Sequence, residues 1–221
     1  MKGYQAQGTG AWASGGNMNT ARNSPDGSGN SNNALIASGG YDGTGVVSIT
    51  ESWDGSSWTE VGDMNTGKSQ GATSGHAPSL ATIHFGGGPA VANAETWNGS
   101  AWTEVSEINN ARSRAGASGV SNTAALVYAG EDGPSPDYTG NTESWDGTSW
   151  TEVADMSTAR YGLTGGGGAM PNATALASGG YTNSSSGMNN TEEWSFPSAP
   201  GVLEGQMWIK TATGASSVMK G

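Results

Sequence analysis

The sequence contains no cysteine among its 221 residues. Disulfide bonds, zinc–thiolate sites and thiol catalysis are therefore excluded for this chain. Basic residues are also scarce, because eight Lys and Arg stand against 19 Asp and Glu, which gives a net charge of −11. An acidic chain of this kind repels a phosphate backbone, so we expect no nucleic acid among its partners.

Long hydrophobic runs and catalytic histidines are missing as well. Apolar residues make up 33% of the chain, and no stretch is long and apolar enough for a membrane-crossing helix. The first residues lack the apolar region of a secretory signal, so we expect neither a signal peptide nor membrane insertion. His76 and His84 are the only histidines, and no Ser-His-Asp set can be assembled around them. We therefore expect a protein that is not an enzyme.

Tryptophan is plentiful instead, and it recurs in a repeated phrase. The phrase is Glu-x-Trp, a short turn with Gly, and Trp-Thr-Glu-Val, and its full copies are Glu51–Val61, Glu95–Val105 and Glu143–Val153. A fourth copy begins at Glu192 and stops after Trp194. The copies are 44 to 49 residues apart, a period typical of β-propeller blades.

The third copy, from Arg112 to Met156, shows how one repeat is built. Four strand-like segments follow one another and are separated by turn residues, at 112–119, 123–129, 142–145 and 150–156. The first is rich in small residues, as suits a strand close to a crowded axis. Asp146-Gly147 is a typical tight hairpin turn between the last two segments. Four antiparallel strands per repeat predict an all-β, four-bladed propeller.

The two ends of the chain predict how the ring closes. The fourth copy lacks its outer strand, whereas residues 10–18 carry a spare one, with Trp12 six residues before Met18. We expect this N-terminal strand to complete the last blade, and the alternative is that it pairs with another subunit. The predicted domains are a propeller over residues 1–198 and a short hairpin tail over 199–221.

The order of these features resembles kelch repeats. The resemblance rests on Gly179-Gly180, on Trp150 and on the spacing from Met156 to Arg160, and it covers about residues 10–197. The wording of the repeat is also similar to kelch-like virion proteins of marine bacteriophages, and residues 205–210 resemble short hairpins of phage fibre proteins. Kelch propellers more often have five to seven blades.

Four cations hold the same place in each repeat: Arg22, Lys68, Arg112 and Arg160. In a propeller blade they share a face with the variable loops at 41–48, 88–94, 131–141 and 181–190, where binding usually occurs. They are candidate ligand-binding residues for an anion or a sugar. Alternatively, each cation pairs with the Glu that begins the third strand of its repeat, and the set is structural.

Three tyrosines on the same loops are the candidates for stacking on sugar rings: Tyr41, Tyr138 and Tyr181. The repeat-periodic tryptophans are expected to pack between blades instead. The acidic loop around Glu131 and Asp137 lacks the ligand spacing of a calcium-binding loop, so no metal site and no cofactor are predicted.

The resemblance implies a non-enzymatic protein on the surface of a bacteriophage particle. It would be a fibre, appendage or head-decoration component, oligomeric in the particle, that adheres to host-surface glycans. Residues 199–221 would contact other virion proteins. One alternative is a cellular kelch module for protein–protein interaction, and another is a glycan-cleaving enzyme.

Overall fold

The computed structural model describes residues 11–74, 79–133, 137–167, 174–182 and 187–195, which form 15 strands and no helix. These residues thus contain no helix long and apolar enough to cross a membrane. The strands make four antiparallel sheets, here called blades 1 to 4. Blade 1 consists of β1 (Asp26–Ser31), β2 (Ala34–Ser38), β3 (Thr50–Trp53) and β4 (Trp58–Glu60). Blade 2 consists of β5 (Ala72–Thr73), β6 (Thr82–Phe85), β7 (Ala94–Trp97) and β8 (Trp102–Val105). Blade 3 consists of β9 (Gly116–Ser121), β10 (Ala124–Tyr128), β11 (Thr142–Trp145) and β12 (Trp150–Val153), and blade 4 of β13 (Thr164–Gly167), β14 (Thr174–Ser178) and β15 (Thr191–Ser195).

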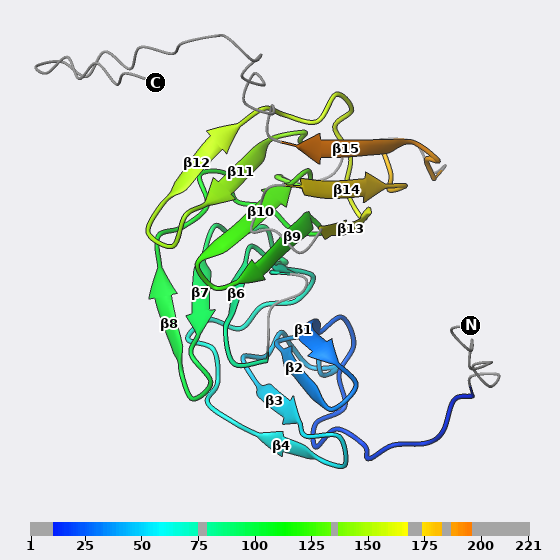
Figure 1. Cartoon of the computed structure of the whole chain (residues 1–221), viewed down its shortest axis with the longest axis vertical. Coiled ribbons are helices and arrows are strands. Elements are labelled where there is room, and N and C mark those ends of the chain that lie inside the picture. Colours follow the sequence, from blue (N-terminus) through cyan, green and yellow to red (C-terminus); the bar gives the residue numbers. More distant parts are fainter. Residues whose placement is uncertain (1–10, 75–78, 134–136, 168–173, 183–186, 196–221) are drawn as a thin grey trace, which may run out of the picture.

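The four blades follow one another along an arc, with β4, β8 and β12 on its outer side (Figure 1). Each blade contacts the next through its first strand, as β1 contacts β5, β5 contacts β9, and β9 contacts β13. Antiparallel sheets packed around a common centre in this way form a β-propeller. The predicted fold class, an all-β four-bladed propeller, is confirmed.

Small residues near the centre make room for one large side chain between blades 3 and 4. The ring of Tyr128 occupies the space that a side chain at Gly116 or Gly165 would need. Its hydroxyl lies 3.3 Å from the carbonyl oxygens of Ala117 and Leu176, one in each blade. Burial raises the pKa of Tyr128 to about 12, because the ionised phenolate would be poorly solvated there.

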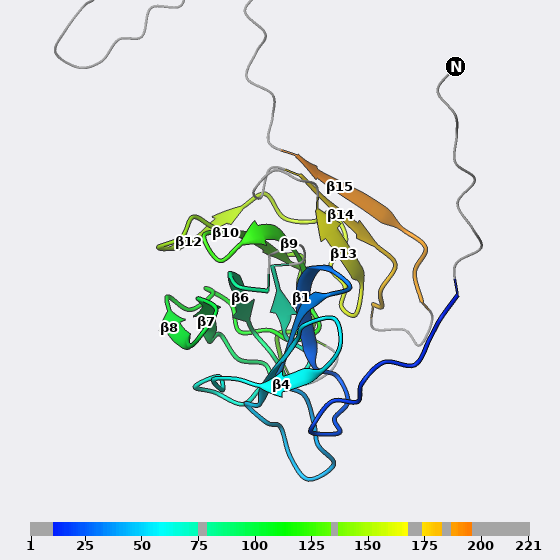
Figure 2. The same cartoon turned by 60° about the horizontal axis from the view of Figure 1, so that its bottom comes forward.

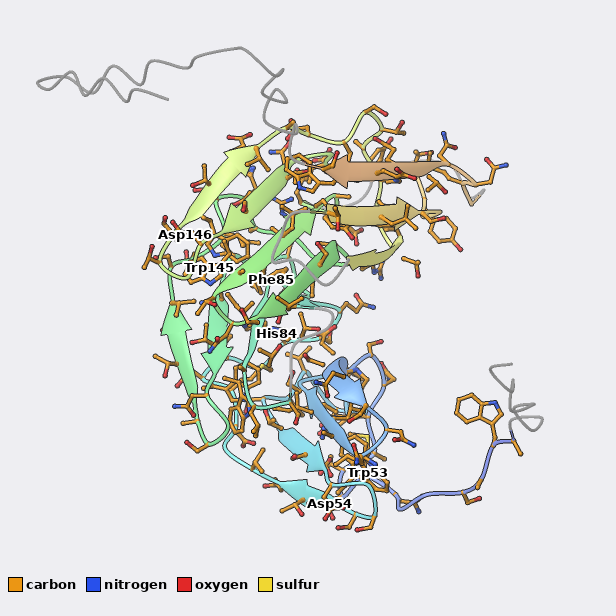
Figure 3. All side chains as sticks on the ribbon, viewed as in Figure 1. Trp53, Asp54, His84, Phe85, Trp145 and Asp146 are labelled. Carbon is orange, nitrogen blue, oxygen red and sulfur yellow. The ribbon has the colours of Figure 1, made fainter. Side chains whose placement is uncertain are left out.

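The hairpin between the last two strands is an Asx turn at the rim of the blade. In blade 1, Asp54 Oδ1 accepts hydrogen bonds from the N–H groups of Ser56 and Ser57, both at 2.8 Å. Gly55 has a φ of 100°, which explains the Gly at this point of the turn. The N–H of Ser57 and the hydroxyl of Ser56 lower the pKa of Asp54 to about 2. Asp146 makes the same turn in blade 3, and both carboxylates lie on the outside of the arc (Figure 3).

Four of the eight tryptophans of the repeat are buried, as predicted, whereas Trp12, which was expected in the core as well, is fully exposed. Trp150 of blade 3 meets Phe85 of blade 2 edge-on at 5.0 Å between ring centroids, and its N–H donates to Ser106 O at 3.0 Å. Trp102 of blade 2 donates to Thr50 Oγ1 of blade 1 at 2.9 Å. The outer tryptophan of one blade is therefore anchored on the blade before it. The buried members of the set are Trp97, Trp102, Trp145 and Trp150.

Blade 4 differs from the prediction, because residues 10–18 do not complete it. Residues 11–18 form no strand, Trp12 is fully exposed, and the described part of blade 4 has three strands. In Figures 1 and 2 this segment leaves blade 1 as a loop and does not run along β15. Among the described residues the arc is open between blades 4 and 1, so β15 and residues 11–18 are not brought together. The predicted tail, residues 199–221, lies outside the described residues.

Candidate functional site

The loops that enter and leave each blade near the centre lie on one face, as predicted. In every blade, the residue after the cation forms an isolated antiparallel bridge with the residue after the Gly-Gly or Ala-Gly pair. These bridges are Asn23–Tyr41, Ser69–Gly88, Ser113–Glu131 and Tyr161–Tyr181. The frame is thus repeated while the residues that it presents differ from blade to blade.

A series of backbone hydrogen bonds links the blades at the centre of this face. The N–H of Gln70 donates to Ser24 O at 3.4 Å, that of Arg114 to Gln70 O at 2.8 Å, and that of Gly162 to Arg114 O at 2.9 Å. All four residues have positive φ, between 50° and 62°, a conformation that costs non-glycine residues energy. Among the described residues the series does not continue from Gly162 to Ser24, which agrees with the open side of the arc.

The four repeated cations are held in buried ion pairs, one in each blade. Arg22 lies 2.9 Å from Glu51, Lys68 lies 3.4 Å from Glu95, Arg160 lies 3.0 Å from Glu192, and Arg112 pairs with Glu143. All four cationic side chains are inaccessible to solvent. The structural alternative of one pair per blade therefore describes them, and none of the four cations has an exposed side-chain atom that could contact a ligand.

The same glutamates also fix the chain where it enters each blade. Glu143 Oε2 accepts hydrogen bonds from the backbone N–H of Asn109 at 2.7 Å and from its side-chain amide at 2.8 Å. On the other side of the pair, Arg112 donates to Asn141 O at 2.7 Å. Burial lowers the pKa of Arg112, and the charge of Glu143 opposes this shift. The pair joins the incoming segment to the third strand of the blade.

A wide depression of about 870 Å³ opens over the centre of the loop face. Its lining comes from blades 1, 2 and 3 and includes Tyr41, Val46, Gln70, Pro89, Glu131 and Asp132. Tyr41 is 40% exposed, and it takes part in none of the aromatic ring contacts among the described residues. The structure therefore separates Tyr41 from the other two predicted tyrosines.

Tyr138 and Tyr181 belong to one aromatic cluster, joined by Tyr161, which the sequence analysis missed. The ring centroids are 6.2 Å apart for Tyr138 and Tyr161 and 5.9 Å apart for Tyr161 and Tyr181. The guanidinium of Arg114 lies 5.9 Å from the centroid of Tyr161. Tyr181 is 44% exposed. Three loops of blades 3 and 4 thus bring three tyrosine rings together, with a cation on one side. We call Tyr138, Tyr161, Tyr181 and Arg114 the tyrosine cluster.

Arg114 connects the tyrosine cluster with the central depression. Its guanidinium lies 3.2 Å from Glu131 and donates to Gln70 Oε1 at 3.1 Å. Arg114 stands at the position held by Ser24, Gln70 and Gly162 in the other blades. A large side chain there, and an aromatic directly after the cation at Tyr161, are the departures from the repeat that could have revealed this site.

No cluster of metal ligands is assembled in the part of the chain that the structure describes. No group of three or more His, Asp and Glu residues is placed there to hold a metal ion. The structure does show an unpredicted pair, in which His84 Nε2 lies 2.8 Å from Asp26 Oδ2. That carboxylate also accepts the N–H of Gly71 at 2.9 Å. His84 is fully buried between blades 1 and 2, close to Phe85 in the interior (Figure 3), so this pair holds two blades together.

No protein-family model matches the sequence, and no curated protein does so either.

Proposed function

We propose that this propeller is a non-enzymatic binding module whose tyrosine cluster recognises glycans of a host surface. The observation that carries the proposal is the cluster itself, in which three aromatic rings and a guanidinium converge from four loops. Sugar rings have apolar faces that stack on aromatic rings and hydroxyl groups that need polar partners. Arg114 and Glu131 supply such partners beside Tyr161, an arrangement typical of small-molecule sites.

The proposed setting is the surface of a bacteriophage particle, as a fibre, an appendage or a head decoration. This part rests on the resemblance of the repeat phrase to kelch-like virion proteins. A rigid all-β frame with variable loops suits repeated display on a particle. Residues 199–221 are proposed to contact other virion proteins.

The absence of an enzymatic role is also a proposal, and it has a physical argument. A glycosidase needs two carboxylates free to exchange protons with the substrate. The repeat-periodic glutamates instead hold buried cations and backbone N–H groups. Release of reducing sugar from a host polysaccharide would contradict this argument and favour the glycan-cleaving alternative.

A glycan array followed by calorimetry on the best ligand tests the binding site. Tyr181→Ala is expected to weaken binding at least about ten-fold, or about 1.4 kcal/mol, because it removes the most exposed ring of the cluster. Tyr41→Ala is the matched control, since Tyr41 holds the same bridge position in blade 1 with similar exposure. Unchanged binding by Tyr181→Ala, or equal losses in both variants, would contradict the proposed site.

The setting is tested separately, with the full chain and with residues 1–198 alone. Co-purification with capsid or tail proteins that depends on residues 199–221 is the expected result. Selective binding to a cellular protein through the loop face, with no glycan bound on the array, would favour the cellular interaction module instead.

A further inference from the structure

We propose that the groove between blades 3 and 4, here called the tryptophan socket, receives residues 11–14 of a second copy of this chain. The socket is lined by Leu126, Tyr128, Thr142, Ala154, Ala175 and Trp194, among others. The inference concerns assembly and does not depend on the proposed glycan site.

The other blade interfaces show what such a groove holds. Trp102 enters the interface before its own blade and donates its N–H to Thr50, the first residue of β3. Trp150 enters the next interface and donates to the carbonyl of Ser106, the first residue after β8. The two outer tryptophans thus use two acceptor positions of the preceding blade, the start of its third strand for Trp102 and the residue after its fourth strand for Trp150.

The socket offers the same two acceptor positions. Thr142 is the first residue of β11, as Thr50 is of β3. Ala154 follows β12, as Ser106 follows β8. Both residues line the groove, so an indole there would find the partners that Trp102 and Trp150 have elsewhere.

The edge of blade 4 is incomplete in the same place. Within the described ranges, β14 is the one strand with which β15 pairs. The side chain of Glu192 is 24% exposed, whereas those of Glu51 and Glu95 are fully buried. A fourth strand would cover this carboxylate, and an open strand edge is a template for pairing with another segment.

Trp12 has the spacing, and the residues that follow it have the attachment point, of the missing strand. The backbone N–H of Asn19 lies 2.7 Å from Glu51, as that of Asn65 does from Glu95. Trp12 precedes Asn19 by the same interval that separates Trp58 from Asn65.

Residues 16–19 lie on blade 1 in the same way as residues 62–65 lie on blade 2. A side-chain carbon at Gly16 would lie 3.4 Å from the ring of Trp53, and one at Gly62 would lie 3.6 Å from Trp97. Among the described residues, those at 11–15 are all exposed, unlike the fourth strands of the other blades.

A second copy can supply the missing strand because the arc is open between blades 1 and 4. Residues 16–22 are fixed on blade 1, and the segment before them leaves the arc (Figure 1). Each copy thus presents one donor strand at one end and one socket at the other. Reciprocal exchange pairs both donors and both sockets in a two-fold dimer, which is the logic of strand swapping. The same exchange places a blade of the second copy beside Trp58, the outer tryptophan of blade 1, which is only half-buried in the single chain.

The absence of cysteine allows a direct test by engineered disulfides. By the register of blade 3, where Ser144 faces Thr151, residue 13 would face Glu193. The variant Ala13→Cys/Glu193→Cys is expected to form a covalent dimer on oxidation. The control Ser52→Cys/Thr59→Cys joins two strands of blade 1 and should crosslink within one chain.

Adding Trp12→Ala to the test variant is expected to lower the crosslinked dimer at least ten-fold, since the anchor of the strand is lost. Trp12 is fully exposed in the isolated chain, so this change leaves the fold intact. Crosslinking of Ala13→Cys/Glu193→Cys within a single chain would overturn the proposal, because the segment would then close its own ring. No crosslink in that variant, while the control pair reacts, would overturn it as well.

Discussion

Replacement of Arg112 by Met tests whether the repeated cations are structural. The guanidinium pairs with Glu143 and donates to the carbonyl oxygens of Asn110, Ala129 and Asn141. Methionine fills similar space but leaves the carboxylate of Glu143 buried without a cation. Breaking one partner of a buried pair costs about 3–5 kcal/mol, which is a large part of the 5–15 kcal/mol that typically stabilises a domain. We expect a loss of this size in the free energy of unfolding.

Urea unfolding followed by tryptophan fluorescence measures this loss, and two further variants separate its causes. Arg112→Lys should cost only about 1–2 kcal/mol, through lost hydrogen bonds, because Lys68 already fills the same place in blade 2. Arg112→Met/Glu143→Gln should be more stable than Arg112→Met, because no uncompensated charge remains buried. A stability within about 0.5 kcal/mol of wild type for Arg112→Met, or a loss of glycan binding without a loss of stability, would refute the structural role.

Three further predictions concern backbone strain and pH. Ala129 has a φ of 59° at the position that Gly86 holds in blade 2, so Ala129→Gly should raise the midpoint of urea unfolding by an amount equivalent to about 0.5–1 kcal/mol. Gly86→Ala should lower this midpoint, because its new carbon would overlap the carbonyl oxygen of Arg112. A lower midpoint for Ala129→Gly, or a higher one for Gly86→Ala, would contradict this prediction. Hydrogen bonds within the turns lower the pKa of Asp54 and Asp146 to about 2. The contribution of these two carboxylates to stability is therefore present above about pH 4 and should be lost as the pH falls towards 2. In thermal melts at acid pH, an Asp54→Asn/Asp146→Asn variant should lose less stability than the wild type. Because the pKa of Tyr128 is raised to about 12, its contribution should be present below pH 10 and lost as the pH rises to 12, so that alkaline melts of Tyr128→Phe should lack this step.

The sequence was sufficient to predict the blades because each blade is specified locally. The tryptophan spacing and the Asp-Gly turn lie within a single repeat, and each strand of a blade pairs with its neighbour in the chain. The shared period of the cations and glutamates also allowed the ion pairs to be considered before they were seen. An interaction that is repeated in every blade places the same types of residue at the same positions of every repeat.

The features that the sequence missed depend on residues brought together from different repeats. Tyr161 joins Tyr138 and Tyr181 through loops of two blades, and His84 meets Asp26 across 58 residues of chain. Neither contact is repeated, so no period reveals it. The expected closure by residues 10–18 failed for a related reason, since it requires blades 1 and 4 to meet, which no local pattern determines.

The central claim is that the repeats fold as blades whose tryptophans are locked between neighbours. Hydrogen exchange of the indole N–H groups, followed by NMR, tests it most directly. Slow exchange is predicted for Trp97, Trp102, Trp145 and Trp150, whose N–H groups donate to protein oxygens, and fast exchange for Trp12 in the isolated chain. Exchange of the four other indoles as fast as that of Trp12 would contradict the account.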